Sequence, residues 1–221
     1  MARCLSLRPR PPKVGRLRLP PLRPYDPGVL DDGDGLDGVE LDDVDLGADL
    51  AGLGVVGSAL RRCHLDGTDL SRGSVAETVL SGCDAANLEA PRSSWRRVEV
   101  SGSRIGSWVL YESDWRSVRV DSTKIDFLNA RAAVWRDVEL RDCRIGELDL
   151  GDAQVERLRL DGCTVGTLSL GHARLRDVDL RGARVELVEG LTGLAGTWIT
   201  SDQLTGLAAS LAAELGVTVL D

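Results

Sequence analysis

Large apolar side chains other than leucine and valine are scarce in this sequence. The 221 residues include one Phe, two Tyr and one Met. Leucine, valine and alanine must therefore form most of the core, which suits narrow stacked columns better than the wide centre of a globular domain. No apolar run approaches the roughly eighteen residues of a membrane-spanning helix, so we expect no membrane association.

The residues of enzyme active sites are equally sparse. His64 and His172 are the only histidines, and neither has a Ser or Cys nucleophile at a known spacing. The sequence has no Gly-rich phosphate loop, HExxH or GxSxG motif. We therefore expect no enzymatic activity, catalytic residue, cofactor or metal. A pair of carboxylates brought together by the fold is the alternative that the sequence leaves open.

What the sequence does contain is a repeat. The segments SSWRRVEV (93–100), SDWRSVRV (113–120) and AVWRDVEL (133–140) recur every twenty residues. Within each, apolar residues recur every fifth position, and the residue two before each is apolar or small. This period of five holds without insertion from Leu50 to Val185, whereas Leu36, Leu41 and Leu46 lie one residue out of phase. Fixed periods of this length are typical of repeat architectures.

A chain that winds as a square tube accounts for both periods. Five residues form one side, four sides form one coil, and coils stack at the inter-strand spacing of about 4.8 Å. One coil cannot bury its inward residues alone, so stability comes from stacking. Trp95, Trp115 and Trp135 are then expected in one inner column, one coil apart.

The pentads ADLAG (48–52), TDLSR (68–72), LDLGD (148–152) and VDLRG (178–182) resemble the pentapeptide-repeat family. The resemblance covers roughly residues 36–190 and implies an all-β solenoid, the right-handed quadrilateral β-helix. One feature departs from the family: the position two before the central residue is large on two of the four sides, as at Val98 and Trp108. We interpret the alternation of large and small residues as a way to fill one cross-section of the tube.

The C-terminal sequence changes to a helical period. Thr200 and Gln203 match a capping box and Gly216 is placed to end the helix. We expect residues 193–221 to form a helical cap over the open end of the tube, with a short strand at 217–220. The family resemblance implies that such modules mediate end-to-end homodimers. The cap and dimer residues would be Leu204, Leu207, Leu211 and Leu215.

The N-terminal residues 1–30 precede the predicted solenoid of residues 31–192. They carry seven basic residues and one acidic residue with many prolines, and residues 31–52 carry nine acidic residues and no basic one. We expect a mostly disordered tail, with a short apolar segment that folds back on the first coil. The segment has no apolar core of a secretory signal, and its prolines oppose the amphipathic helix of a transit peptide. The acidic stretch is either neutralised by the tail or a solvated first coil.

Four of the five cysteines, Cys63, Cys83, Cys143 and Cys163, fall in one inner column. Zinc needs four ligands around one point, whereas these side chains would run parallel. Adjacent-coil disulfides are also disfavoured, because the coil spacing exceeds the usual Cβ separation of about 3.8 Å. We expect small core residues in a reducing, cytoplasmic setting, with Cys4 exposed in the tail.

Two outward surfaces stand out. Arg96, Arg116, Arg136 and Arg176 follow the tryptophan column, and we expect acids such as Asp137 and Asp177 to pair with them. Several apolar residues occupy outward positions in two adjacent coils, where Trp108 would join them if it does not fit inside. They either form an interface or merely cover the tube wall. These residues are Val109, Tyr111, Phe127, Ala132 and Val134.

The function expected first is a non-enzymatic rod or scaffold that binds an unidentified protein partner. The alternative comes from the resemblance, which includes DNA mimics that bind and protect DNA gyrase from quinolones. The net charge of −8 favours it, but residues 53–192 carry 20 basic and 22 acidic residues and are nearly neutral. We therefore place gyrase second. We do not expect direct nucleic-acid binding, because seven basic residues in a proline-rich tail are a weak signal.

Overall fold

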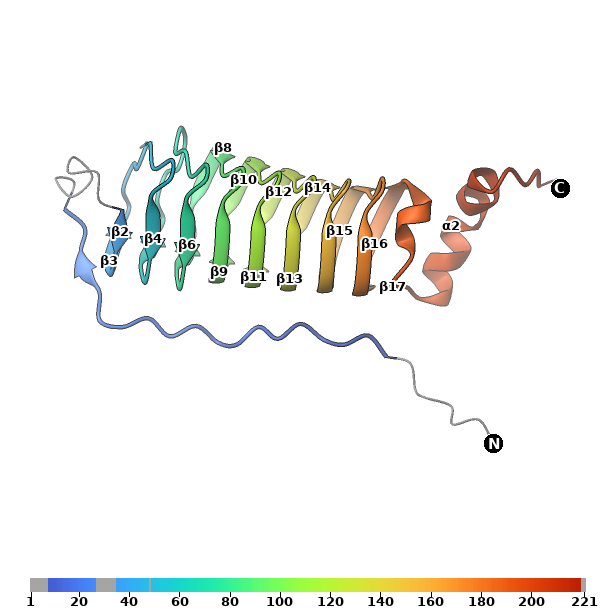
Figure 1. Ribbon diagram of the computed structural model, residues 1–221, viewed down its shortest axis with the longest axis horizontal. Helices are drawn as coiled ribbons and strands as arrows, with labels where there is room; N and C mark the ends of the chain where they lie inside the picture. The colour runs from blue at the N-terminus through green and yellow to red at the C-terminus, as the bar shows by residue number, and fades with distance from the viewer. Residues whose placement is uncertain (1–7, 27–34, 48, 220–221) are drawn as a thin grey trace.

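The computed structural model describes residues 8–26, 35–47 and 49–219. Over these residues the chain winds as a parallel β-solenoid, and an α-helix follows its last coil (Figure 1). This confirms the predicted fold class. The early strands are β1 (Arg23–Pro24), β2 (Leu36–Asp37), β3 (Val39–Asp42), β4 (Gly54–Val56), β5 (Ala59–Arg61), β6 (Ser74–Ala76), β7 (Val79–Ser81) and β8 (Asp84–Glu89).

The later elements are longer because the pairing between coils continues on both sides of a corner. They are β9 (Ser94–Ser101), β10 (Arg104–Val109), β11 (Asp114–Asp121), β12 (Lys124–Asn129), β13 (Val134–Arg141), β14 (Arg144–Asp149), β15 (Gln154–Ser169) and β16 (Arg174–Glu189). The 3-10 helix η1 (Leu191–Leu194), the strand β17 (Thr197–Trp198) and the helix α2 (Ser201–Glu214) complete the chain.

Residues twenty apart lie side by side on neighbouring coils. Trp115 pairs in parallel register with Trp95 on one side and with Trp135 on the other. In the first coils the offset is nineteen: Leu36 pairs with Val55. Asp45 still pairs nineteen residues ahead, with His64, whereas Asp49 pairs twenty residues ahead, with Asp69. The first coil is therefore one residue shorter than the later ones. This explains why the first leucines of the sequence are out of phase.

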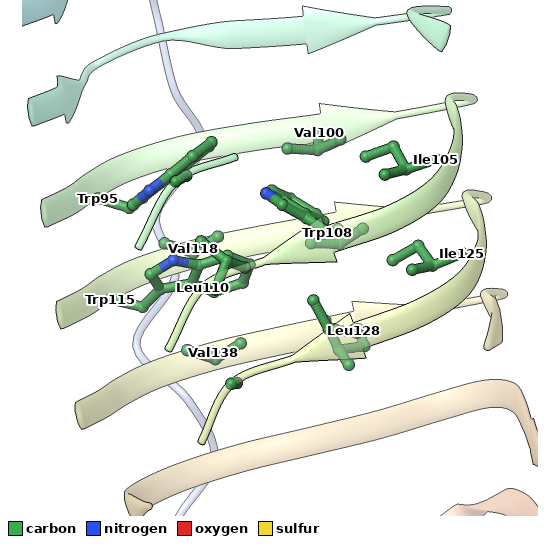
Figure 2. Packing of buried hydrophobic residues seen from close by; sticks show 14 of the residues in the cluster. Trp95, Val100, Ile105, Trp108, Leu110, Trp115, Val118, Ile125, Leu128 and Val138 are labelled. Atoms are coloured by element: carbon green, nitrogen blue, oxygen red, sulfur yellow. The ribbon is translucent and has the colours of Figure 1, made fainter. Parts of the chain in front are cut away.

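Four tryptophans fill the middle of the core, and Figure 2 shows Trp95, Trp108 and Trp115 among their neighbours. Trp95, Trp108, Trp115 and Trp135 are all fully buried. The rings of Trp115 and Trp135 stack with centroids 4.7 Å apart and planes 10° apart. Trp108, from β10, lies 5.5 Å from the Trp95 ring and 5.3 Å from the Trp115 ring. Trp108 therefore belongs to the core and not to the surface patch, because Trp95 and Trp115 leave space for one more large ring.

The four cysteines of the inner column are buried free thiols. Their sulfur atoms donate to backbone carbonyls of the corners. Cys143 Sγ, for example, lies 3.1 Å from the carbonyl oxygen of Arg141. They pack as small core residues, as the sequence indicated, and Cys4 lies outside the described residues.

Residues 8–26 take one extended path along a wall of the solenoid, from its late coils back to its first (Figure 1). At the first coil Arg23 and Pro24 of β1 pair with β3, so this end of the segment lies beside the first coil. The sequence predicted a mostly disordered tail. Residues 8–26 instead follow the wall, where side chains accept hydrogen bonds from the tail backbone. Residues 1–7 and 27–30 of that prediction lie outside the described residues.

The helix α2 begins with the predicted capping box. Thr200 Oγ1 accepts from the Gln203 amide at 3.1 Å, and Gln203 Oε1 accepts from the Thr200 amide at 2.7 Å. The side-chain nitrogen Nε2 of Gln203 also donates to the backbone carbonyls of Leu180 and Ala183, both at 2.8 Å, and so holds the helix to the last coil. The strand predicted at 217–220 is not formed at residues 217–219, and Leu220 lies outside the described residues.

Candidate interaction surfaces

The predicted apolar patch comes from β10, β12, β13 and the turns beside them, in two adjacent coils. Its residues are mostly half-buried, and only Ala132 is exposed. The ring of Tyr111 lies under the guanidinium of Arg92, with Cζ 5.8 Å from the ring centroid. Val109, Tyr111, Phe127 and Val134 thus cover the wall and expose only part of their surface. Their role as an interface stays a prediction.

The predicted pairing of Asp137 and Asp177 with the arginine column is wrong. Asp137 Oδ1 lies 2.7 Å from Nε of Arg157, and Asp177 lies 3.6 Å from Nε of Arg10. Residues 137 and 157 occupy the same corner one coil apart, both with left-handed backbone, so their side chains stack directly. In the arginine column, Arg116 pairs with Asp114 of its own strand at 2.8 Å.

These ion pairs gather on the wall that residues 8–26 cross. We call it the tail-facing wall and define it by Glu99, Ser117, Arg119, Asp137 and Asp177. The guanidinium of Arg119 forms ion pairs with Glu99, on the coil before it, and with Glu139, on the coil after it. The nitrogen–oxygen distances are 3.1 and 3.2 Å. The hydrogen bond from Arg157 holds the pKa of Asp137 below its usual range, and the amide of Lys13 adds to this effect. Because most wall carboxylates already have a cationic partner, the wall is charged but largely compensated.

The C-terminal end of the rod is the most apolar exposed region among the described residues. Leu207 and Leu211 of α2 pack against the core, whereas Leu204 is 50% exposed and Leu215 is 77% exposed. A groove of about 490 Å³ lies between α2 and the last coil. Its apolar lining consists of Leu180, Ala183, Val185, Val188, Leu194, Ile199 and Leu207.

The titratable groups outside these walls show no convergent arrangement. His64 is exposed, and its Nδ1 lies 2.8 Å from Oδ1 of Asp84, a hydrogen bond that raises the pKa of His64 above 6.5. His172 also points outward. Over the described ranges, no three His, Cys, Asp or Glu side chains come close enough to hold a metal ion. No helix in those ranges is long and apolar enough to cross a membrane.

Sequence reasoning missed two features. The first is a set of exposed apolar residues at the C-terminal end. Leu187 is 50% exposed, and Val217 and Val219, which follow α2, are 54% and 68% exposed. Leu187 stands in the same outward column as Phe127, through Glu147 and Thr167, so the reasoning that found Phe127 applies to it as well. The docked tail was the second omission. Its signal is the alternation of arginine and leucine from Arg16 to Leu19.

Comparison with known proteins finds no family model and no curated protein that matches this chain. Among solved structures, it is similar to those of QnrB1, described as a plasmid-mediated fluoroquinolone resistance protein. Full-length QnrB1 is 16% identical over 81% of this chain and 90% of that chain, with a TM-score of 0.34. Two trypsin-treated QnrB1 variants are 15% and 16% identical over 85% of this chain and 100% of theirs, with TM-scores of 0.32 and 0.23. At these identities and TM-scores the likeness carries no functional argument, and function has to be argued from the surfaces described above.

Proposed function

We propose that this chain is a non-enzymatic pentapeptide-repeat protein that acts in the cytoplasm as a rigid protein-binding rod. The in-phase pentads of the sequence and the stacked coils support the family assignment. The buried free thiols suit a reducing compartment. The outward positions carry mainly charged and small residues arranged in columns, which favours contact with the flat face of another protein over enclosure of a small molecule.

The apolar C-terminal end is the observation that carries this proposal. Exposed apolar residues gather there beside an open groove, and such clusters mark protein interfaces. A second copy meeting the same end would cover the same residues on both subunits, as a two-fold interface requires. We therefore propose an end-on homodimer through α2 and the last coil. The exposed residues concerned are Leu187, Leu204, Leu215, Val217 and Val219.

The molecular mass in solution tests this interface. Light scattering of the natural chain should give about twice its 23.7 kDa. Leu204→Asp with Leu215→Asp should give a monomer, because buried unpaired carboxylates are costly at an interface. Val56→Asp is the matched control, since Val56 is 38% exposed at the other end of the rod. A natural chain that is monomeric at micromolar concentration, or a double variant that remains dimeric, would remove the end-on dimer.

The half-buried patch on β10, β12 and β13 is a second proposed surface for a different protein partner. Aromatic residues are enriched among the side chains that dominate interfaces. Phe127→Ser with Tyr111→Ser should reduce partner recovery in pull-downs, provided that thermal melts match those of the natural chain. Equal recovery by both proteins would show that these rings only cover the wall.

DNA gyrase is the second candidate partner, through mimicry of duplex charge. The exposed acids of the first coils favour it, and the paired charges farther along the rod count against it. A duplex carries about one charge per 1.7 Å of axis. If gyrase is the partner, the protein binds gyrase and changes the inhibition of DNA supercoiling by a fluoroquinolone. No effect on supercoiling at micromolar protein would exclude gyrase as the partner. The acids are Asp37, Glu40, Asp42, Asp43 and Asp45, and Arg61 and Arg62 pair with two of them.

A further inference from the structure

Residues 8–26, the tail segment, cross the tail-facing wall at right angles to its strands (Figure 1). The backbone groups of the wall are already paired from coil to coil, so the tail segment cannot join the sheet there. Its amides meet side-chain carboxylates instead. The amide of Arg10 donates to Asp177 at 3.2 Å, that of Lys13 to Asp137 at 2.8 Å, and that of Leu17 to Glu99 at 3.1 Å.

The wall also donates to carbonyl groups of the tail segment. Ser117 Oγ donates to the carbonyl of Lys13 at 3.2 Å, and Nη2 of Arg119 donates to that of Val14 at 3.2 Å. Both polarities of a peptide backbone are thus recognised by fixed side chains on a rigid scaffold. Bonds that involve a charged partner are roughly twice as strong as neutral ones.

The two faces of the tail segment differ in kind. Its half-buried side chains are apolar or aromatic, whereas its basic side chains are exposed, and of these Arg10 pairs with Asp177 at 3.6 Å. The half-buried apolar side chains form the face that rests on the wall. The half-buried residues are Pro9, Pro12, Val14, Leu17, Leu19, Leu22 and Tyr25, and the exposed basic ones are Arg8, Arg10, Lys13, Arg16, Arg18 and Arg23.

The spacing of two of these contacts, those of Arg10 and Lys13, matches a polyproline II chain. Three residues of that helix advance about 9.3 Å, and two coils advance about 9.6 Å. Arg10 and Lys13 are three residues apart, and the carboxylates they meet, Asp177 and Asp137, are two coils apart. Prolines favour this backbone conformation before binding, which lowers the entropy cost of docking.

The tail segment nevertheless fits the wall incompletely. Between Gly15, Arg16 and Leu17 on one side and Arg97, Glu99 and Ser117 on the other lies a cavity of about 180 Å³. Six residues of the tail segment are prolines, which have no amide to donate. Few directional bonds over a long contact are typical of a ligand that can be exchanged.

We propose that the tail-facing wall is a binding track for extended proline- and arginine-rich peptides, and that residues 8–26 are its resident occupant. A partner segment of the same chemistry replaces the tail segment by docking on the same carboxylates. The attached occupant competes at the high effective concentration of a tethered ligand. The track lies along the side of the rod, so the proposal does not depend on the dimer through its C-terminal end.

The test uses the full-length chain and a fluorescent synthetic peptide with the sequence of residues 8–26. Leu17→Asp with Leu19→Asp turns two half-buried tail side chains into acids, the first of them next to Glu99, and should release the resident occupant without altering the wall. If nine-tenths of the natural chain has the track occupied, the peptide should bind the released variant about tenfold more tightly. Arg18→Gln, on the solvent face of the tail segment, is the control and should bind like the natural chain.

A second pair of variants shows whether the peptide uses the same track. In the released background, Asp177→Asn removes the carboxylate that pairs with Arg10 and leaves the ion pair of Asp137 with Arg157 intact. It should weaken peptide binding, and adding Asp137→Asn should weaken it further, with circular dichroism to confirm the fold. The proposal is overturned if the released variant binds no more tightly than the natural chain. It is overturned equally if the two wall variants bind as well as the released variant.

Discussion

At the residue scale, the corners of the coils demand an unusual backbone. Sixteen described residues other than glycine have positive φ, among them Ala132 at 53° and Asp137 at 59°. A left-handed conformation costs a residue with a Cβ about 1–2 kcal/mol relative to the right-handed one. The coil stacking must offset this cost at corner after corner.

Ala132 is a suitable position to measure the corner cost, because its side chain is small and exposed. Ala132→Gly should stabilise the fold by about 0.5–1 kcal/mol, since glycine adopts this φ freely. Ala132→Val should destabilise it, because a branched Cβ fits this region worst. Thermal melts of the three proteins check the order, and a glycine variant that melts below the natural chain would contradict the argument.

The exposed pair of His64 and Asp84 gives a pH-dependent contact. Because the pKa of His64 is raised above 6.5 by this partner, the stabilisation is complete below about pH 6.5 and is lost as the pH rises through the folded-state pKa. An NMR titration of the imidazole should therefore show a midpoint above 6.5. In Asp84→Asn the midpoint should fall toward 6.5; an unchanged midpoint would mean that the pair does not form in solution.

At the element scale, the tail segment is the part least secured to the rest. Its directional contacts with the wall are mostly hydrogen bonds to charged side chains, and salt weakens such contacts at the surface. Only β1 joins the sheet, through Arg23 and Pro24 beside β3. The tail segment should therefore detach while the solenoid stays folded.

Limited trypsin digestion of the natural chain checks this detachment. The bonds after Lys13, Arg16 and Arg18 are cleavable, whereas those after Arg8, Arg10 and Arg23 precede proline. Cleavage at the first three should be faster at about 1 M than at about 0.01 M salt, where the screening lengths are about 3 and 30 Å. Rates are normalised to a small uncharged substrate, so that any effect of salt on trypsin cancels. Equal normalised rates would show that charge does not hold the tail segment.

The sequence allowed some elements to be predicted and not others, for physical reasons. Trp95, Trp115 and Trp135 repeat at the period of the coil, so their stacking follows from their spacing alone. The capping box of Thr200 and Gln203 is a local pattern of residues three apart, and it too can be predicted from spacing. The contact of Asp177 with Arg10 joins residues far apart in the chain and follows no period, so only the fold reveals it.

At the scale of the whole molecule, stacking produces a rod (Figure 1). Its walls carry ion pairs, and exposed apolar residues gather at its C-terminal end. Its walls are patterned in columns because every residue meets its equivalent one coil away. The end has no further coil, and Leu187 of β16 and Leu204 of α2 stay exposed there. This asymmetry between walls and end is the central claim of the functional proposal.

Small-angle X-ray scattering tests that claim most directly, because it reports the length of the particle as well as its mass. The account predicts a natural chain whose maximum dimension is about twice that of the Leu204→Asp, Leu215→Asp variant, as two rods meeting end to end require. A dimer no longer than the variant, with the rods side by side, would contradict it, and so would a natural chain of the same length and mass as the variant.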